Sequence, residues 1–153
     1  MTVNARRRSF ITRFFALCVL PFAPARAAEA PAESVEAMVL KITRGVSVTT
    51  GRVKLDLPLL ADNGNSVSLK VSVDSPMTAA NHVKSIHLYA ARNPRPNVAN
   101  FYLGPRAGRA QVSTRIRLGG TQRVLAVAAL SDGSFWSATA DVVVTLSACY
   151  DPT

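Results

Sequence analysis

Residues 112–118, VSTRIRL, indicate the fold class most clearly, because mostly apolar and strongly polar side chains alternate there, with Thr114 the one hydroxyl side chain in the mostly apolar set. One set comprises Val112, Thr114, Ile116 and Leu118, and the other comprises Ser113, Arg115 and Arg117. A period of two sends successive side chains to opposite faces of a β-strand. The stretch therefore predicts a strand with one face in a core and the other in water.

Working outward from this strand, the same signals recur along the chain. Alternation marks residues 53–57 and 67–73, and a near-continuous apolar run at 124–130 is typical of a central strand. Turn signals stand at 62–65, DNGN, and at 131–134, SDGS. Less regular strands are expected at 83–89, 98–103 and 135–146. About seven short strands predict an all-β fold, an immunoglobulin-like antiparallel β-sandwich over residues 46–146.

A helical pattern precedes the sandwich. Ser34 is suited to cap a helix, and Glu36 lies in its first turn. Apolar residues then recur at helical spacing, and Gly45 follows as a stop signal. Residues 28–45 therefore predict a linker and a short amphipathic helix, 34–44, that packs against the following domain.

Residues 1–27 are typical of an export signal. Arg7 and Arg8 precede Phe10 in the pattern of a twin-arginine signal, and a short apolar segment follows. An ordinary Sec signal is the alternative. Cleavage is expected after Ala27, which predicts a periplasmic protein exported by the twin-arginine route.

The charge of the chain changes when the signal is removed. The full sequence has a formal net charge of +9, but five arginines and no acidic residue lie in the signal, which leaves roughly +4. A mildly basic surface of this kind does not indicate nucleic-acid binding. The mature part has no segment long enough for a membrane helix, so no membrane attachment is expected.

Two cysteines are present, and Cys18 lies in the signal. Cys149 then remains alone, which excludes an internal disulfide and indicates a reactive thiol or an intermolecular bond. A buried free thiol is the other alternative, although the place of Cys149 near the terminus argues against burial. His82 and His87 lack further ligands at metal spacing, and a surface or half-buried strand histidine is the expected role of each. No catalytic motif, metal or cofactor is predicted, so the protein is not expected to be an enzyme.

Several stretches together resemble one family, the SoxY sulfur-carrier subunit of the periplasmic thiosulfate-oxidising system. They are residues 51–58 GRVKLDLP, 61–64 ADNG, 73–78 VDSPMT, 83–86 VKSI, 93–99 NPRPNVA, 114–118 TRIRL, 121–122 TQ, 126–128 AVA and 131–134 SDGS. The resemblance implies an immunoglobulin-like sandwich, a heterodimer with a SoxZ-like subunit, and docking with sulfur-oxidising redox enzymes. It also implies a carrier that holds sulfur covalently on a cysteine near the C-terminus.

Residues 147–153, SACYDPT, form the predicted cysteine arm. The family arm reads Gly-Gly-Cys-Gly-Gly. Cys149 matches its cysteine, while Ser147, Ala148, Tyr150 and Asp151 stand in place of the glycines. The resemblance thus implies a SoxY-related paralogue with a variant arm and with sulfur attached at Cys149. The alternative is a binding or assembly subunit in which Cys149 forms an intermolecular disulfide.

Overall fold

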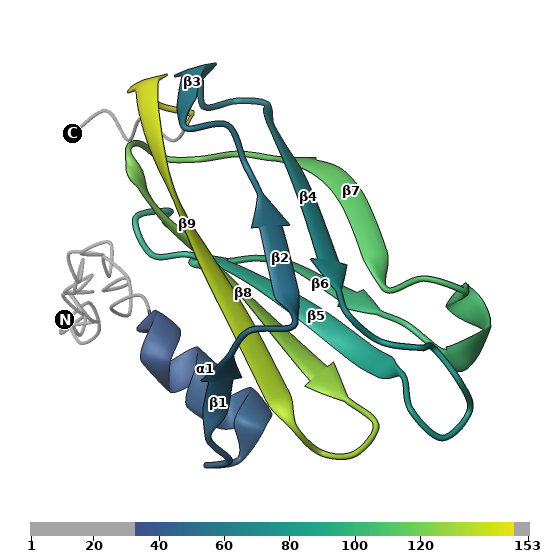
Figure 1. Cartoon of the computed structure of the whole chain (residues 1–153). Helices are drawn as coiled ribbons and strands as arrows, with labels where there is room; N and C mark the ends of the chain where they lie inside the picture. Colours follow the sequence, from purple (N-terminus) through teal and green to yellow (C-terminus); the bar gives the residue numbers. More distant parts are fainter. Residues whose placement is uncertain (1–32, 149–153) are drawn as a thin grey trace, which may run out of the picture. The chain divides into compact units, whose positions relative to one another are not determined.

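Two packed β-sheets and one α-helix make up residues 33–148, the part of the chain that the computed structural model describes (Figure 1). The elements are α1 (Val35–Thr43), β1 (Val48–Thr50), β2 (Val53–Asp56), β3 (Leu60–Asn63), β4 (Val67–Val73), β5 (Val83–Ala90), β6 (Asn97–Tyr102), the 3₁₀ turn η1 (Pro105–Ala107), β7 (Gln111–Ile116), β8 (Gln122–Leu130) and β9 (Phe135–Leu146). The predicted signal residues Arg7, Arg8 and Phe10, and the predicted cleavage after Ala27, lie outside the described residues.

The larger sheet has the strand order β1-β9-β8-β5-β6, with β3 also paired to β9, and the smaller sheet has the order β2-β4-β7. The predicted immunoglobulin-like sandwich is confirmed. The sandwich differs from the purely antiparallel prediction in two short pairings, because β1 and β3 run parallel to β9. β1 pairs with the start of β9, β3 with its end and β8 with residues 135–142, so this long strand has a partner along nearly its whole length.

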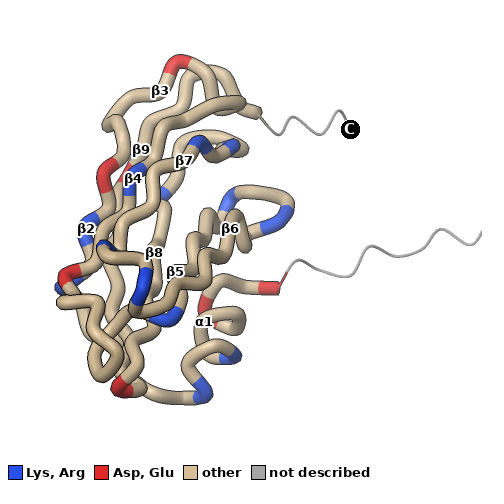
Figure 2. The backbone as a smooth tube through the Cα atoms, turned by 90° about the vertical axis from the view of Figure 1, so that its right-hand side faces the viewer, with Lys and Arg blue, Asp and Glu red and all other residues tan. Residues whose placement is uncertain are grey.

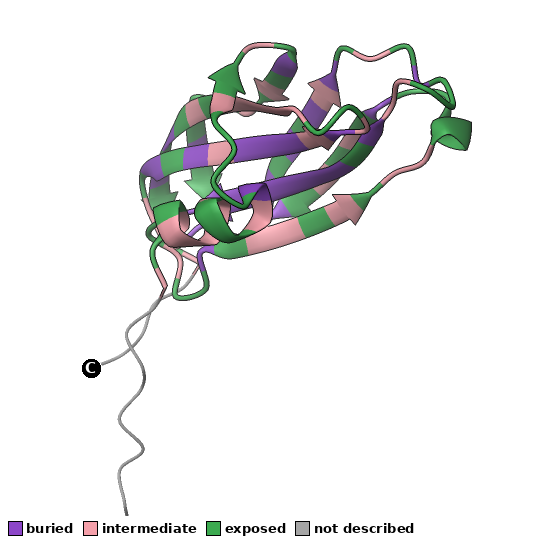
Figure 3. Cartoon of the chain, turned by 90° about the horizontal axis from the view of Figure 1, so that it is seen from below, coloured by how far each residue is buried: buried purple, intermediate pink, exposed green. Residues whose placement is uncertain are grey.

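The core fills the space between the two sheets. In β4 the residues Val67, Leu69, Val71 and Val73 are buried, and the alternate positions face outward. The alternation of residues 112–118 is confirmed in β7 and beyond, since Ile116 and Leu118 are buried while Arg115 and Arg117 are exposed. Figure 3 shows the buried positions running along the central strands.

The helix begins and ends close to the predicted residues. The amide of Ala37 donates a hydrogen bond to Ser34 Oγ over 3.2 Å, which confirms the cap. At the other end Arg44 takes a left-handed conformation with φ of 53°, and Gly45 follows with φ of 85°. Apolar side chains of α1 and Leu125 of β8 line one hollow, which places the helix against the larger sheet.

The outer face of the larger sheet is also partly covered. Val127 alternates along β8 with the core residues Ala126 and Ala128, yet it is fully buried, as is Tyr89 in β5. In the described part of the chain, no helix has the length and apolar character needed to cross a membrane.

Candidate functional site

The end of β9 is the candidate site, because it leads directly to the predicted sulfur-attachment residue Cys149. Cys149 itself lies outside the described residues, and Ala148 is the last residue within them. The amide of Ala148 donates a hydrogen bond to the carbonyl oxygen of Leu118 over 3.0 Å. The backbone is therefore held against the sandwich up to the residue before the cysteine.

Gly64 joins the three segments that meet at this point. Its amide donates to the carbonyl oxygen of Leu146 over 2.7 Å, and its carbonyl oxygen accepts from the amide of Leu118 over 2.9 Å. A Cβ atom at position 64 would lie 3.0 Å from both Leu146 O and Ala148 N, and closer still to Leu118 O. All three contacts are with backbone atoms that cannot rotate away, so only glycine fits.

The loop before β8, residues 117–121, is also hydrogen-bonded to neighbouring segments near the end of β9. Asn93 Oδ1 accepts hydrogen bonds from the amide of Gly119 over 2.8 Å and from Gln122 Nε2 over 3.0 Å. The amide of Val144 in β9 donates to Thr121 Oγ1 over 2.9 Å. Side chains from distant parts of the sequence thus fix the loop whose Leu118 end holds Ala148.

Sequence reasoning predicted sulfur attachment at Cys149 but missed these supporting residues. Gly64 was identified only within a turn signal and a family-like stretch, and Asn93 only within a family-like stretch. The turn is confirmed, because the amide of Asn65 donates to Asn63 Oδ1 over 2.9 Å. The second role of Gly64 depends on Leu118 and Leu146, which local sequence patterns do not bring together.

His82 and His87 have different hydrogen-bond partners and are not bonded to each other. The His82 amide donates to Ser131 Oγ over 3.0 Å, and its Nδ1 lies 3.2 Å from Thr78 O. His87 is buried, which corrects the expectation of a surface or half-buried side chain. Its Nδ1 lies 2.8 Å from Asn100 Oδ1, and its Nε2 lies 2.9 Å from Ser85 Oγ.

The burial of His87 follows from these neighbours and from the ring of Tyr102, which meets it edge-on at 6.2 Å between centroids. Both ring nitrogens have partners, so the side chain is satisfied without a metal. Within residues 33–148, no group of three or more His, Cys, Asp or Glu side chains is placed to hold a metal ion.

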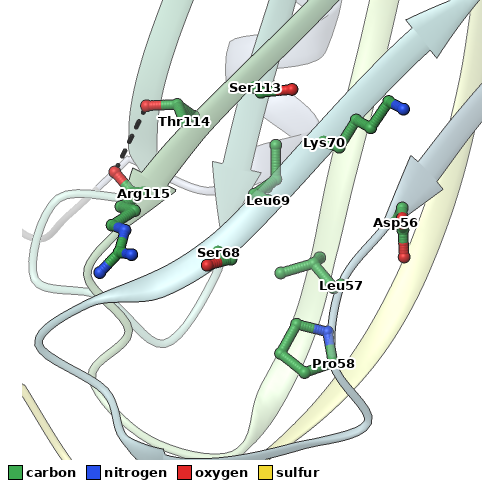
Figure 4. A pocket seen from close by; sticks show the side chains of 9 residues that line it. All are labelled: Asp56, Leu57, Pro58, Ser68, Leu69, Lys70, Ser113, Thr114 and Arg115. Carbon is green, nitrogen blue, oxygen red and sulfur yellow. Dashed lines mark hydrogen bonds between the residues drawn. The ribbon is translucent and has the colours of Figure 1, made fainter.

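A separate hollow of about 480 Å³ lies on the smaller sheet (Figure 4). Its lining residues are Asp56, Leu57, Pro58, Ser68, Leu69, Lys70, Ser113, Thr114 and Arg115. The hydrogen bond drawn there joins Thr114 Oγ1 to the carbonyl oxygen of Arg115. Neither a histidine nor a cysteine is among these residues, and no serine there is paired with a base.

The described residues form an immunoglobulin-like sandwich whose backbone is held as far as Ala148. The chain belongs to the SoxY family, since the family model described as "Sulfur oxidation protein SoxY" matches residues 36–149. The match includes Cys149 and nearly all of the described residues.

Solved structures agree on the fold. The sulfur carrier protein SoxY from Chlorobium limicola f thiosulfatophilum is 23% identical, with a TM-score of 0.62 over 74% of this chain and 97% of that one. A superoxide reductase (neelaredoxin) from Ignicoccus hospitalis is 18% identical, with a TM-score of 0.57 over 63% of this chain and 94% of that one. These likenesses show a shared sandwich. Among curated proteins, no sequence matches the chain.

Proposed function

We propose that this protein is a periplasmic sulfur carrier that holds sulfur intermediates covalently on Cys149 during the oxidation of thiosulfate or a related sulfur compound. Membership of the SoxY family supports the role, and the family match extends to Cys149. The solved SoxY structure with the same fold is named a sulfur carrier protein. In this role the protein is not itself an enzyme but presents its cargo to enzymes.

The observation that carries the proposal is the hydrogen bond from the amide of Ala148 to the carbonyl oxygen of Leu118 over 3.0 Å. A carrier has to offer its thiol at a defined place on a stable body. The hydrogen bond at Ala148 fixes the chain up to the residue before the cysteine, so the arm starts from a defined place on the domain. A cysteine meant only to fill a core needs no such mount one residue before it.

The chemistry of loading requires a second protein. Joining a thiosulfate sulfur to the Cys149 thiol forms one S–S bond, releases the thiol proton and removes two electrons. In this proposal a sulfur-oxidising redox enzyme of the periplasm accepts the electrons and carries out the step. The carrier contributes the thiol and the surface on which the enzyme docks.

A SoxZ-like subunit is the proposed permanent partner. Within the described residues, β6 ends one sheet and β7 ends the other, so both strands have a free edge. Exposed edges invite pairing with another chain unless they are covered. Twin-arginine export supports this arrangement, since that route carries folded proteins and can take out a partner without a signal of its own.

The test loads the mature chain, beginning at Ala28, together with its SoxZ-like partner and a thiosulfate-oxidising enzyme system. We expect intact-mass spectra to show sulfur adducts that a reductant removes, and we expect Cys149→Ser to abolish them. The matched control adds Ser113→Cys to Cys149→Ser, which moves the thiol to an exposed position on β7. That thiol should react with small reagents but should receive no sulfur from the enzymes.

Two outcomes would contradict the carrier role. Equal loading at position 113 would show that any exposed thiol is modified. A stable covalent dimer without sulfur adducts would favour the alternative, in which Cys149 makes an intermolecular disulfide.

A further inference from the structure

A further hollow, of about 380 Å³, lies between the C-terminal end of α1 and the outer face of the larger sheet. Its lining comes from residues 42–46, from β5 and from the ends of β8 and β9 that form a hairpin. Phe135 lines the hollow and is the first residue of β9, whereas Leu146 is the last. The two ends of this strand are roughly 35 Å apart at the usual rise per residue. This hollow, which we call the α1–β5 pocket, is therefore separate from the site at the end of β9.

Two cationic residues line the pocket, and no acidic residue does. Arg44 caps the C-terminal end of α1, Lys84 lies near the start of β5, and both are exposed. Figure 2 shows Lys and Arg positions at this end of α1. Within residues 33–148, neither Arg44 nor Lys84 belongs to an ion pair. The mouth of the pocket therefore carries two positive charges that can attract an anion.

The end of the helix offers little opposing charge. Carbonyl oxygens at a helix C-terminus carry about half a negative unit charge in total, which disfavours an anion. Here the carbonyl oxygen of Thr43 accepts from the amide of Val46 over 3.0 Å, and that of Leu40 accepts from Thr43 Oγ1 over 3.4 Å. The full positive charge of Arg44 at the same helix end outweighs what remains.

Ser85 and His87 give the pocket a buried polar floor, since each is only 7% exposed. Ser85 Oγ lies 2.9 Å from His87 Nε2, and His87 Nδ1 lies 2.8 Å from Asn100 Oδ1. Because Asn100 Oδ1 can only accept, a neutral His87 ring uses its single proton there, and the Ser85 hydroxyl donates to Nε2. The floor then has no donor left for a ligand. An anionic group is thus disfavoured at the floor and belongs at the exposed cations.

The remaining walls are apolar. They are formed by Ile42, Val46, Ala129 and Phe135. Ligand pockets typically have volumes of about 300–1,000 Å³, mostly apolar walls and a few polar groups that fix the orientation of the ligand. The α1–β5 pocket has this composition and a volume suited to a small molecule.

We propose that the α1–β5 pocket binds a small organic anion, which is a carboxylate or a sulfonate on an apolar body. Arg44 and Lys84 hold the anionic group by charge-assisted hydrogen bonds, and the apolar body lies against the walls at Val46 and Phe135. The site goes beyond the proposed carrier function, because neither the thiol nor the end of β9 takes part. An acidic side chain of a partner protein has the same chemistry, and the test distinguishes it.

The test compares benzoate with benzamide, two probes of nearly the same shape of which only the first is charged. NMR titrations follow both in the mature chain carrying Cys149→Ser, which removes the thiol from the experiment. We expect benzoate to bind more tightly than benzamide, with ring-current shifts at the methyl groups of Ile42 and Val46. Arg44→Gln and Lys84→Gln should each weaken benzoate roughly five-fold, as expected for one charge lost at about 4 Å in water. Both should leave benzamide binding unchanged.

Two further variants are the controls. Lys54→Gln removes the same charge from an exposed position on the smaller sheet, outside the pocket lining, and should not change benzoate binding. Val46→Ser makes one wall polar at a residue that is 49% exposed, so the fold should tolerate it. It should weaken benzoate and benzamide alike, whereas the charge variants should affect benzoate alone.

The titration is repeated with the SoxZ-like partner bound. We expect the benzoate affinity to be the same as in the free chain. If pairing abolishes binding, the pocket is part of a protein interface and the ligand proposal is wrong.

The proposal is also overturned if benzoate binds no more tightly than benzamide, or if Lys54→Gln weakens benzoate as much as Arg44→Gln does. The second result would mean that the overall charge, and not the pocket, attracts the anion. The carrier role is judged separately by sulfur loading at Cys149. Arg44→Gln in the parent chain should leave that loading unchanged.

Discussion

The amide nitrogen of Gly64 lies 2.7 Å from the carbonyl oxygen of Leu146, so the turn after β3 and the end of β9 are joined backbone to backbone. The two residues belong to distant parts of the sequence. Their contact leaves no room for a side chain at position 64, because three backbone atoms surround the site of the missing Cβ.

We expect Gly64→Ala to destabilise the protein by about 1–3 kcal/mol, the range for forcing a methyl group into a packed site. Urea or thermal denaturation measures the loss. Gly104→Ala is the control, since a Cβ there meets nothing within 4 Å and the backbone is extended with φ of −138°. An equal loss for the two variants would show that the contacts around Gly64 do not limit its side chain.

The buried histidine yields a prediction about its tautomer. Asn100 Oδ1 can only accept a hydrogen bond, so the proton of a neutral His87 ring belongs on Nδ1, and Nε2 then accepts from Ser85 Oγ. Nitrogen-15 NMR should report the Nδ1–H form at a pH where the ring is neutral. An Nε2–H form would mean that the amide of Asn100 is turned the other way.

Removing Asn100, the partner of His87 Nδ1, should lower the stability of the protein by about the contribution of one hydrogen bond. We expect Asn100→Ala to lower the free energy of unfolding by about 1 kcal/mol. Asn97→Ala serves as the comparison, because Asn97 is equally exposed on the same strand but its side chain makes no hydrogen bond within residues 33–148. It should change stability by less than about 0.5 kcal/mol. Equal effects of the two substitutions would remove the support for a structural role of the pair.

Two carboxyl groups should titrate below their ordinary range. Hydrogen bonds from the side chain and amide of Ser134 lower the pKa of Asp132, and the Arg123 guanidinium lowers the pKa of Asp141. Carbon-13 NMR titration should find both midpoints below the usual value of about 3.9. Arg123→Gln should raise the pKa of Asp141 and leave that of Asp132 unchanged, so the second group is an internal control.

The same shift at Asp132 predicts how stability depends on pH. A carboxyl group with a lowered folded-state pKa stabilises the fold above its unfolded pKa, near 3.9, and that contribution is lost as pH falls through the folded pKa. The stability difference between the parent and Asp132→Asn should therefore shrink as the pH drops below about 4. A constant difference down to pH 2 would contradict the assigned shift.

The arm variant tests what separates this chain from carriers with a glycine-rich arm. Tyr150 adds bulk and Asp151 adds negative charge next to Cys149. We expect Tyr150→Gly combined with Asp151→Gly to increase sulfur loading by a thiosulfate-oxidising system, as measured from intact mass. If the folded and paired variant gains nothing, then the surface of the sandwich, rather than the arm, sets the specificity.

Export provides a test in cells. Replacing Arg7 and Arg8 with lysine should trap the precursor in the cytoplasm, because twin-arginine export requires the arginine pair. Immunoblots of fractionated cells measure the precursor and the mature form. Normal export of this double variant would identify an ordinary Sec signal.

The local features of the fold were predictable from sequence because their causes are local. The cap at Ser34 and the hairpin at 131–134 depend on residues within a few positions of one another. The short strands β1 and β3 were not predicted. Each has three or four residues, and each exists because β9 offers a parallel edge that no local pattern reveals.

The candidate site likewise has one part that sequence can predict and another that depends on contacts between distant segments. The count of cysteines and the family resemblance predict Cys149 as the attachment residue, and this stays a prediction because Cys149 lies outside the described residues. The residues that hold the base of the arm could not be predicted, because Gly64, Leu118 and Ala148 are brought together only by the closure of the sandwich.

The length of β9 has a mechanical consequence. The strand extends from Phe135 to Leu146, and a force applied at Ala148 along its axis would act on the whole strand. The hydrogen bonds to β8, β1 and β3 lie across that axis, so the load falls on many of them at once, in shear, instead of opening them one by one. Hydrogen bonds loaded together in shear resist such a force better than bonds that open one after another, so β9 gives the C-terminal end of the described chain a firm mechanical attachment.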